Sequence, residues 1–298
     1  MWDRRATLGV SMALSLAVGC ATPTSLFATR VEVQPVEASS LFPVGRLRVA
    51  IPPGFSPSGS ETWTTGVEVW TERLEGTADE RWARELAALP VGAERERFDW
   101  GDDVRAVSWA QANDLYLQVM KPFGDHVLWL RRDYPAQKLA TAEKLLRELL
   151  RVYSPGSRDG FGVEHGAFHR VAQLENAQLS LRSTSPDVRL RLISRSTVEA
   201  EQRDPALIAR EVEAAGGRLE LLRAGPRTVA GLSGQELVMK LTAPDLKSMV
   251  RFEWAHRGAP SSRDPGVALE ATGLADSAAA VELAWEQLVR ALQVELPR

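Results

Sequence analysis

The sequence has a single cysteine, Cys20, among its 298 residues. One thiol cannot form an intramolecular disulfide, so the folded chain depends on burial of apolar side chains for its stability. Hydrophobic residues make up 44% of the chain and charged residues 25%, a balance typical of folded rather than disordered proteins. The length is sufficient for two ordinary domains.

The sequence also has no excess of positive charge. It contains 36 Lys and Arg against 39 Asp and Glu, which gives a formal net charge of -3. Binding to nucleic acid needs a strongly basic surface. We therefore expect no nucleic-acid partner.

The hydrophobic stretch near the N-terminus is short. Ala6–Gly19 follows Arg4 and Arg5, and it is shorter than the roughly 20 apolar residues that a membrane-spanning helix needs. A basic start followed by such a stretch is typical of a signal peptide. We predict that residues 1–19 are a leader removed on export.

The leader ends in LAVGC, Leu16–Cys20, which resembles the lipobox of bacterial lipoproteins. The resemblance implies cleavage before Cys20, a diacylglycerol on its thiol, and a chain anchored to a membrane in the periplasm. Ala17 departs from the Leu that is more common there, and Ala21 in place of Asp favours sorting to the outer membrane. The alternative is an incidental thiol beside an ordinary export signal. Residues 20–40 are rich in Ser, Thr, Ala and Pro, which is typical of a flexible tether.

Hydrophobic periodicity predicts strands and two helices in residues 41–153. Thr77 and Glu80 have the spacing of a capping box, which marks the start of one helix. Gly101 and the two aspartates after it are typical of a hairpin turn. The expected strands lie near 44–51, 63–74, 98–100, 104–109, 115–119 and 127–130, and the expected helices over 77–89 and 139–149.

Residues 153–162 contain Pro155, three glycines and two serines, which predicts a connection between domains. The expected strands beyond it lie near 161–169, 177–182, 188–194, 219–241, 250–255 and 267–271, and the expected helices over 205–215 and 281–292. We therefore predict an α+β fold with two domains, 41–153 and 162–298, joined by a linker at 154–161. Each domain is expected to be a largely antiparallel sheet packed with helices, and the two to face a cleft.

The sequence offers few residues in catalytic patterns. Ser233 in GLSGQ is one glycine short of a nucleophile elbow, and the strand expected after it favours a hairpin turn. His165 and His169 would lie roughly 13 Å apart on the strand expected there, too far to share one zinc ion. His126 and His256 have no Ser or Asp pattern that suggests a triad. We expect neither a metal nor a cofactor.

The run from Leu207 to Leu241 is LIAREVEAAGGRLELLRAGPRTVAGLSGQELVMKL. It resembles the core signature of the Tli-type immunity proteins, in which a helix precedes an arginine-rich strand and a glycine turn. The turn positions are Val229, Ala230, Gly231, Gly234 and Glu236. Three further segments agree with the family in the same order. They are VGR with a following strand and proline at 44–52, FEW with a following glycine at 252–258, and a closing helix with Trp285.

The resemblance implies a periplasmic immunity protein of two domains that is not an enzyme. Such a protein binds a phospholipase effector delivered by type VI secretion and blocks it by stoichiometric occlusion. Two alternatives remain: a structural or lipid-carrying envelope lipoprotein, and an envelope hydrolase that uses Ser233. The exposed segment after Trp254 offers Arg257, Arg263 and Asp264 as candidate partner contacts.

Overall fold

A computed structural model describes residues 41–91, 93, 95–111, 114–157, 160–169, 175–195, 205–244, 247–258 and 265–294. The predicted leader, Cys20 and the tether lie outside these residues. All of the described residues belong to one compact unit, Val33–Arg298. Among the described helices, none combines the length and apolar composition needed to cross a bilayer.

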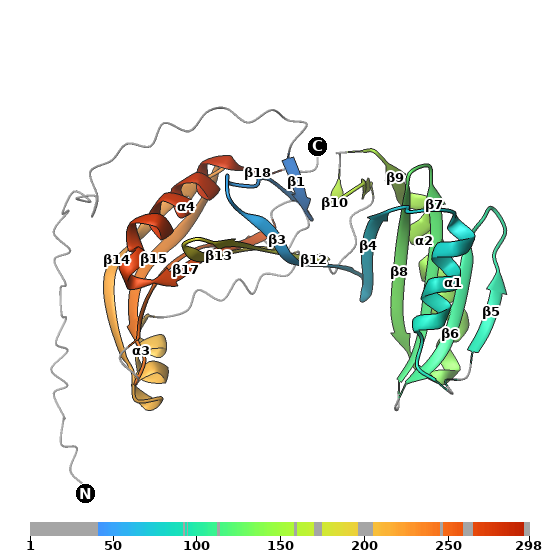
Figure 1. Cartoon of the computed structure of the whole chain (residues 1–298), viewed down its shortest axis with the longest axis horizontal. Helices are drawn as coiled ribbons and strands as arrows, with labels where there is room; N and C mark the ends of the chain where they lie inside the picture. Colours follow the sequence, from blue (N-terminus) through green and yellow to red (C-terminus); the bar gives the residue numbers. More distant parts are fainter. Residues whose placement is uncertain are drawn as a thin grey trace, which may run out of the picture. The chain divides into compact units, whose positions relative to one another are not determined.

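Most of the chain forms antiparallel strands, and the largest sheet has twelve of them (Figure 1). In spatial order they are β14 (Arg218–Val229), β15 (Leu232–Thr242), β16 (Ser248–His256), β17 (Gly266–Leu274), β13 (Asp187–Arg195), β12 (Glu175–Thr184), β3 (Ser56–Thr64), β4 (Val67–Arg73), β8 (His126–Tyr134), β7 (Asp114–Phe123), β6 (Arg105–Gln111) and β5 (Arg95–Asp99). The helices are α1 (Ala78–Ala88), α2 (Leu139–Val152), α3 (Pro205–Ala214) and α4 (Ala278–Ala291), with short 3-10 turns η2 (Ala136–Lys138) and η3 (Ala275–Ser277). The predicted α+β class is confirmed.

The strands from β4 to β6 are covered by a helix on each face. In β8, Leu128 and Leu130 pack with Leu146 of α2, whereas Trp129 packs with Trp82 of α1. Successive side chains of a strand point to opposite faces, so α1 and α2 lie on opposite sides of these strands. A strand that is apolar on both faces requires this arrangement.

The predicted capping box begins α1. The Thr77 hydroxyl accepts a hydrogen bond from the Glu80 amide at 3.2 Å, and the Thr77 amide donates to the Glu80 carboxylate at 2.8 Å. These two bonds satisfy backbone donors that the first turn leaves without helical partners. The capping-box prediction is confirmed.

The strands from β14 to β12 carry α4 along one face (Figure 1). Trp285 and Leu288 of α4 are fully buried, and the Trp285 ring lies 6.0 Å from that of Phe252 on β16. Polar contacts fix the helix as well: Trp285 Nε1 donates to Glu236 at 2.9 Å, and Arg227 donates to Glu286 at 2.8 Å. The amphipathic pattern of the closing helix therefore places it on the sheet as predicted.

Two small sheets of three strands each accompany the large one, and the first of them joins segments far apart in the sequence. One contains β1 (Leu41–Val44), β2 (Leu47–Ala50) and β18 (Leu292–Val294), and the other contains β9 (Tyr153–Pro155), β10 (Phe161–Val163) and β11 (Gly166–Phe168). Strand β2 pairs with β18, and β3 pairs with β12, so residues 41–64 pair with strands that follow residue 174. The domain boundary at 154–161 and the cleft stay predictions.

Three predicted strands are wrong in the same way. The strand expected near 44–51 is interrupted by a turn at Gly45 and Arg46, so that β1 and β2 pair as a hairpin. The strand expected over 63–74 is interrupted by a turn at Thr65 and Gly66, both with positive φ, which lets β3 and β4 fold back on each other. The strand expected over 161–169 is the β10–β11 hairpin. Gly166 is required there, because a Cβ atom would lie 2.5 Å from the Tyr153 hydroxyl.

Candidate functional site

Ser233 does not have the geometry of a nucleophile. It is the second residue of β15, directly after the turn at Ala230 and Gly231, and it pairs with Thr228 across the hairpin. The hairpin prediction is confirmed, although Ser233 lies in the strand and not in the turn. A nucleophile elbow needs a helix after the serine, whereas a strand follows here. His256 Nδ1 donates to the backbone carbonyl of Ser233 at 2.7 Å.

The remaining histidines do not form a catalytic or metal-binding set. His165 lies in the β10–β11 turn and His169 follows β11, so the prediction that both lie on one strand is wrong. The rings of His126 and His165 are 5.2 Å apart, and His126 Nε2 lies 3.3 Å from the Tyr153 hydroxyl. Burial raises the pKa of Tyr153, so the phenol stays protonated near neutral pH. No group of three or more metal-ligating side chains occurs among the described residues.

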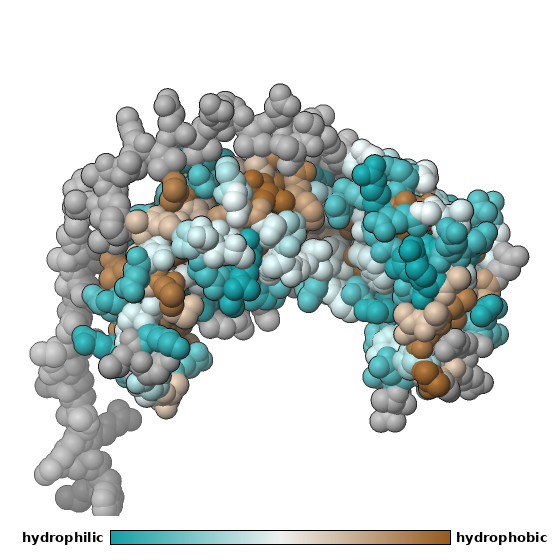
Figure 2. Space-filling view, viewed as in Figure 1, coloured by the Kyte–Doolittle hydropathy of each residue, from teal (hydrophilic) through white to brown (hydrophobic). Residues whose placement is uncertain are grey.

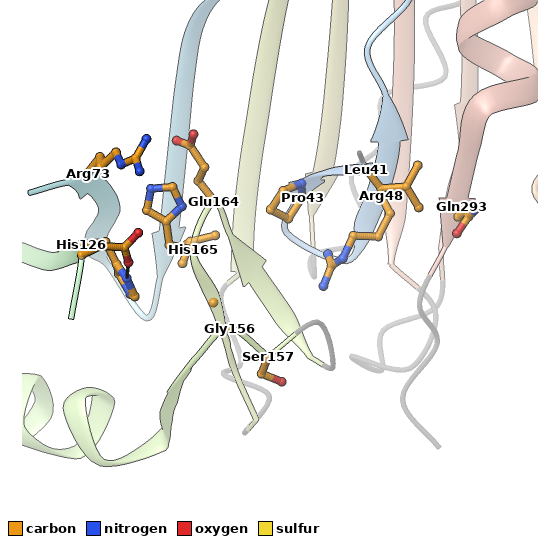
Figure 3. Close-up of a pocket in the computed structure, with 13 residues that line it drawn as sticks. Leu41, Pro43, Arg48, Arg73, His126, Gly156, Ser157, Glu164, His165 and Gln293 are labelled. Carbon is orange, nitrogen blue, oxygen red and sulfur yellow. Dashed lines mark hydrogen bonds and ion pairs between the residues drawn. The ribbon is translucent and has the colours of Figure 1, made fainter. Parts of the chain in front are cut away.

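His126 and His165 line a polar pocket of about 540 Å³ (Figure 3). Arg73, Glu164 and His165 lie on one side and Arg48 on the other. The remaining lining residues are Leu41, Pro43, Asp125, His126, Gly156, Ser157, Val163, Gly166 and Gln293. Two arginines against two carboxylates leave no net charge to select an ion. Arg48 donates to the carbonyls of Gly45 and Leu47 at 3.0 Å each, so its guanidinium is engaged with the backbone.

Large hydrophobic side chains are exposed at only a few of the described positions. The exposed large hydrophobic side chains belong to several different elements: Val91, Leu207, Leu221, Leu222, Met249, Leu274 and Leu283. On the face in Figure 2, hydrophobic residues form separate areas between hydrophilic ones. A lipid carrier would need a continuous apolar cavity or groove.

One face of the sheet from β16 to β12 is not covered by the helices. Along each of these strands, the alternate residues that point toward α4 are buried. They are Val250, Phe252 and Trp254 of β16, Val267, Leu269, Ala271 and Gly273 of β17, Val188, Leu190, Leu192 and Ser194 of β13, and Ala177, Leu179, Leu181 and Ser183 of β12. The intervening side chains point away from α4 and none is buried. We call these the open face: Met249, Arg251, Glu253 and Ala255 of β16, Ala268, Glu270, Thr272 and Leu274 of β17, Asp187, Arg189, Arg191 and Ile193 of β13, and Gln178, Ser180 and Arg182 of β12.

Charge is unevenly distributed over the open face. On β16 and β17, Arg251 forms ion pairs with both Glu253 and Glu270, so that half has one carboxylate more than it has basic side chains. On β13 and β12 lie Arg182, Arg189 and Arg191, and Arg195 follows on the same face at the end of β13. We call these four the arginine surface. The nearby carboxylates on this face are Asp187, which pairs with Arg182 at 3.0 Å, Glu270, which lies opposite Arg191 on β17, and Glu61, which lies opposite Gln178 on β3.

The structure describes only one of the residues singled out as partner contacts. Arg257 is exposed and directly follows β16, whereas Cys20, Arg263 and Asp264 lie outside the described residues. The arginine surface was not identified from the sequence as a candidate site. Its signal is the alternation in DVRLRLISR, in which every second residue of β13 is apolar or small and three of the others are arginine.

Comparison with known proteins points to one family. Residues 156–289 match the family model described as the Tle cognate immunity protein 4 C-terminal domain. No curated protein matches. The apo structure of the immunity protein TplEi of the type VI secretion system from Pseudomonas aeruginosa is 17% identical, with a TM-score of 0.65 over 87% of this chain and 97% of that one.

A chain in the crystal structure of the Tle4–Tli4 complex is similar as well. It is 15% identical, with a TM-score of 0.66 over 88% of this chain and 100% of that one. At these identities the likeness shows a shared fold. Together with the family model, it confirms the resemblance first seen in the sequence: the chain is similar to the Tli-type immunity proteins, and its residues 156–289 are those that match their C-terminal domain.

Proposed function

We propose that the chain is a type VI secretion immunity protein that binds a Tle-type phospholipase effector and inhibits it by stoichiometric occlusion. The match of residues 156–289 to the immunity family is the observation that carries this proposal. The fold shared with solved immunity proteins covers most of this chain. One chain with that fold was crystallised in a complex of Tle4 with Tli4.

The described side chains support a role in binding without catalysis. Ser233 is followed by a strand, and the hydroxyl that contacts the His126 ring is the phenol of Tyr153. Burial keeps that phenol protonated. A protein of this kind would act by occupying the effector rather than by modifying it.

Inhibition by occupancy sets a requirement on affinity. Nanomolar binding corresponds to roughly -12 kcal/mol, and interfaces that reach it commonly bury about 1,200–2,000 Å² in total. A chain with an uncovered sheet face and few exposed large hydrophobic side chains among its described residues would supply this area with a largely polar surface.

The proposal includes export and anchoring. The LAVGC sequence at Leu16–Cys20 supports cleavage before Cys20 and attachment of lipid to its thiol. The diacylglycerol on Cys20 would hold the protein at a membrane in the periplasm, where an antibacterial phospholipase acts. Ala21 supports the outer membrane as its location.

The test is protection of cells that produce a Tle-type phospholipase, and the first candidate is any lipase encoded by the neighbouring gene. We expect cells with periplasmic lipase to survive when they also express the chain, and to lyse without it. The variants Ser233→Ala and His165→Ala should protect as well as the wild type, since neither side chain is assigned to the chemistry. Loss of protection in Ser233→Ala, with normal amounts of folded protein, would favour the hydrolase alternative.

A further inference from the structure

We propose that the arginine surface docks an acidic segment of the partner protein. If the partner is the effector, the inference deepens the proposed function. It rests on the proposed function only for the identity of that partner. The surface consists of Arg182, Arg189, Arg191 and Arg195, all exposed on one side of β12 and β13.

The positive charge of these arginines is only partly neutralised in the free chain, where Asp187 pairs with Arg182 and Glu270 lies directly opposite Arg191. Arg182 and Arg189 are directly opposite each other in the β12–β13 register, and Arg191 lies two residues further along the same face. Like charges directly opposite each other on a sheet destabilise it. Arg189 has no ion-pair partner among the described residues. A partner that supplies carboxylates would remove this repulsion.

Two of the arginines are held in place by neighbours on the sheet. Arg191 Nη2 donates to Gln178 Oε1 at 2.6 Å, whereas Arg182 donates to both carboxylate oxygens of Asp187, at 3.0 Å and 3.3 Å, so a partner carboxylate would have to use its remaining N–H groups. These contacts reduce the rotamer freedom that a docking partner would have to restrict. The guanidinium group binds a carboxylate through two parallel hydrogen bonds, which favours Asp and Glu as partner residues.

The surroundings favour a protein partner over a membrane. The side chains between the arginines are Gln178, Ser180 and Ile193, and none of them is aromatic. Binding to a lipid surface usually combines basic residues with apolar side chains that insert into it. Asp187 and Glu61 at the margin would repel a continuous anionic surface, but a partner with separate carboxylates can avoid them.

The test compares two double variants of residues 33–298, the compact unit that contains every described element. Arg189→Glu/Arg191→Glu reverses the arginine surface. Arg151→Glu/Arg290→Glu makes the same change in net charge at basic residues in the last turns of α2 and α4. Equal melting temperatures establish that both variants fold. If the charge-reversal variant does not fold, Arg189→Gln/Arg191→Gln is tested in its place.

The first probe is a fluorescein-labelled peptide of alternating Glu and Gly, with a peptide of alternating Gln and Gly as the neutral control. We expect the wild type to bind the Glu peptide and not the Gln peptide, and added salt to weaken the binding. The reversal should lower the affinity about tenfold or more, whereas the helix variant should stay within about twofold of the wild type.

The second probe is the Tle-type phospholipase used in the protection test, and its result separates the two proposals. A tenfold loss of lipase affinity in the reversal alone supports docking of the effector at this surface. If the wild type binds the Glu peptide but not the lipase, the proposed function fails and the acidic-segment site stands. If the reversal binds both probes as well as the wild type, the site is overturned. The site is also overturned if the reversal abolishes binding to phosphatidylglycerol vesicles while the Glu peptide never binds.

Discussion

The ion pair between Arg46 and Glu175 should contribute strongly to stability. Arg46 lies in the turn between β1 and β2, and Glu175 begins β12. Two hydrogen bonds join their side chains, at 2.8 Å and 3.0 Å, and both side chains are only 3% exposed. The pair therefore links the first described segment to the strands that follow residue 174 through a buried contact.

Removing one partner leaves the other charge buried without compensation. For such a pair the expected loss is about 3–5 kcal/mol in the free energy of unfolding. At roughly 2–4 °C per kcal/mol for a chain of this size, Glu175→Ala should lower the melting temperature by about 6–20 °C. Removing both charges in Arg46→Met/Glu175→Leu should recover most of this loss, because apolar residues of similar volume can replace a buried pair.

The control is an ion pair that water screens. Arg182 and Asp187 are joined at 3.0 Å, but their side chains are 48% and 46% exposed. Arg182→Ala should therefore cost no more than about 1 kcal/mol. Urea unfolding of the single and double variants measures these values. A loss for Glu175→Ala no larger than that for Arg182→Ala would refute the reasoning from burial.

Three further predictions concern packing, charge and the anchor. Gly166→Ala should destabilise the chain by about 1–3 kcal/mol because the new Cβ would clash with Tyr153, whereas Gly59→Ala, which meets nothing within 4 Å, should change the urea midpoint little. Burial raises the pKa of Glu282 above its usual value of 4.5. Ionisation is therefore penalised in the folded chain, stability falls as pH rises through and above 4.5, and Glu282→Gln should flatten this fall in a pH series of unfolding curves. Labelled palmitate should enter the wild type but not Cys20→Ser, and equal labelling of both would contradict the lipoprotein proposal.

Local patterns predicted the elements whose determinants lie close together in the sequence. The capping box at Thr77 and Glu80 placed the start of α1 correctly. The alternation of Val250, Phe252 and Trp254 placed β16, and these residues form the face buried under α4. Helical and strand periods are directly visible in a sequence, so no tertiary information was needed.

Pairing between distant segments could not be predicted in this way. Nothing in residues 41–50 indicates that β2 pairs with β18 near the C-terminus. The turn at Thr65 and Gly66 was missed because a strand-like pattern continues on both sides of it. Its glycine was the available signal.

The arginine surface depends on tertiary structure as well. The alternation of Val188, Leu190 and Leu192 with Arg189 and Arg191 indicated a strand with one wet face. Only the sheet order places Arg182 beside Arg189 and leaves that face without a helix. The repulsion that motivates the proposed site is therefore a property of the fold and not of either strand alone.

The most direct test of the central claim is a titration of lipase activity. Residues 33–298 are added in increments to a fixed amount of the Tle-type phospholipase used in the protection test, at a concentration far above the expected nanomolar Kd, and the remaining phospholipid hydrolysis is measured. Stoichiometric occlusion predicts a linear fall that reaches zero at one chain per lipase, with both proteins recovered intact. Complete loss of activity well below that ratio, or full activity at a large excess of the chain, would contradict it.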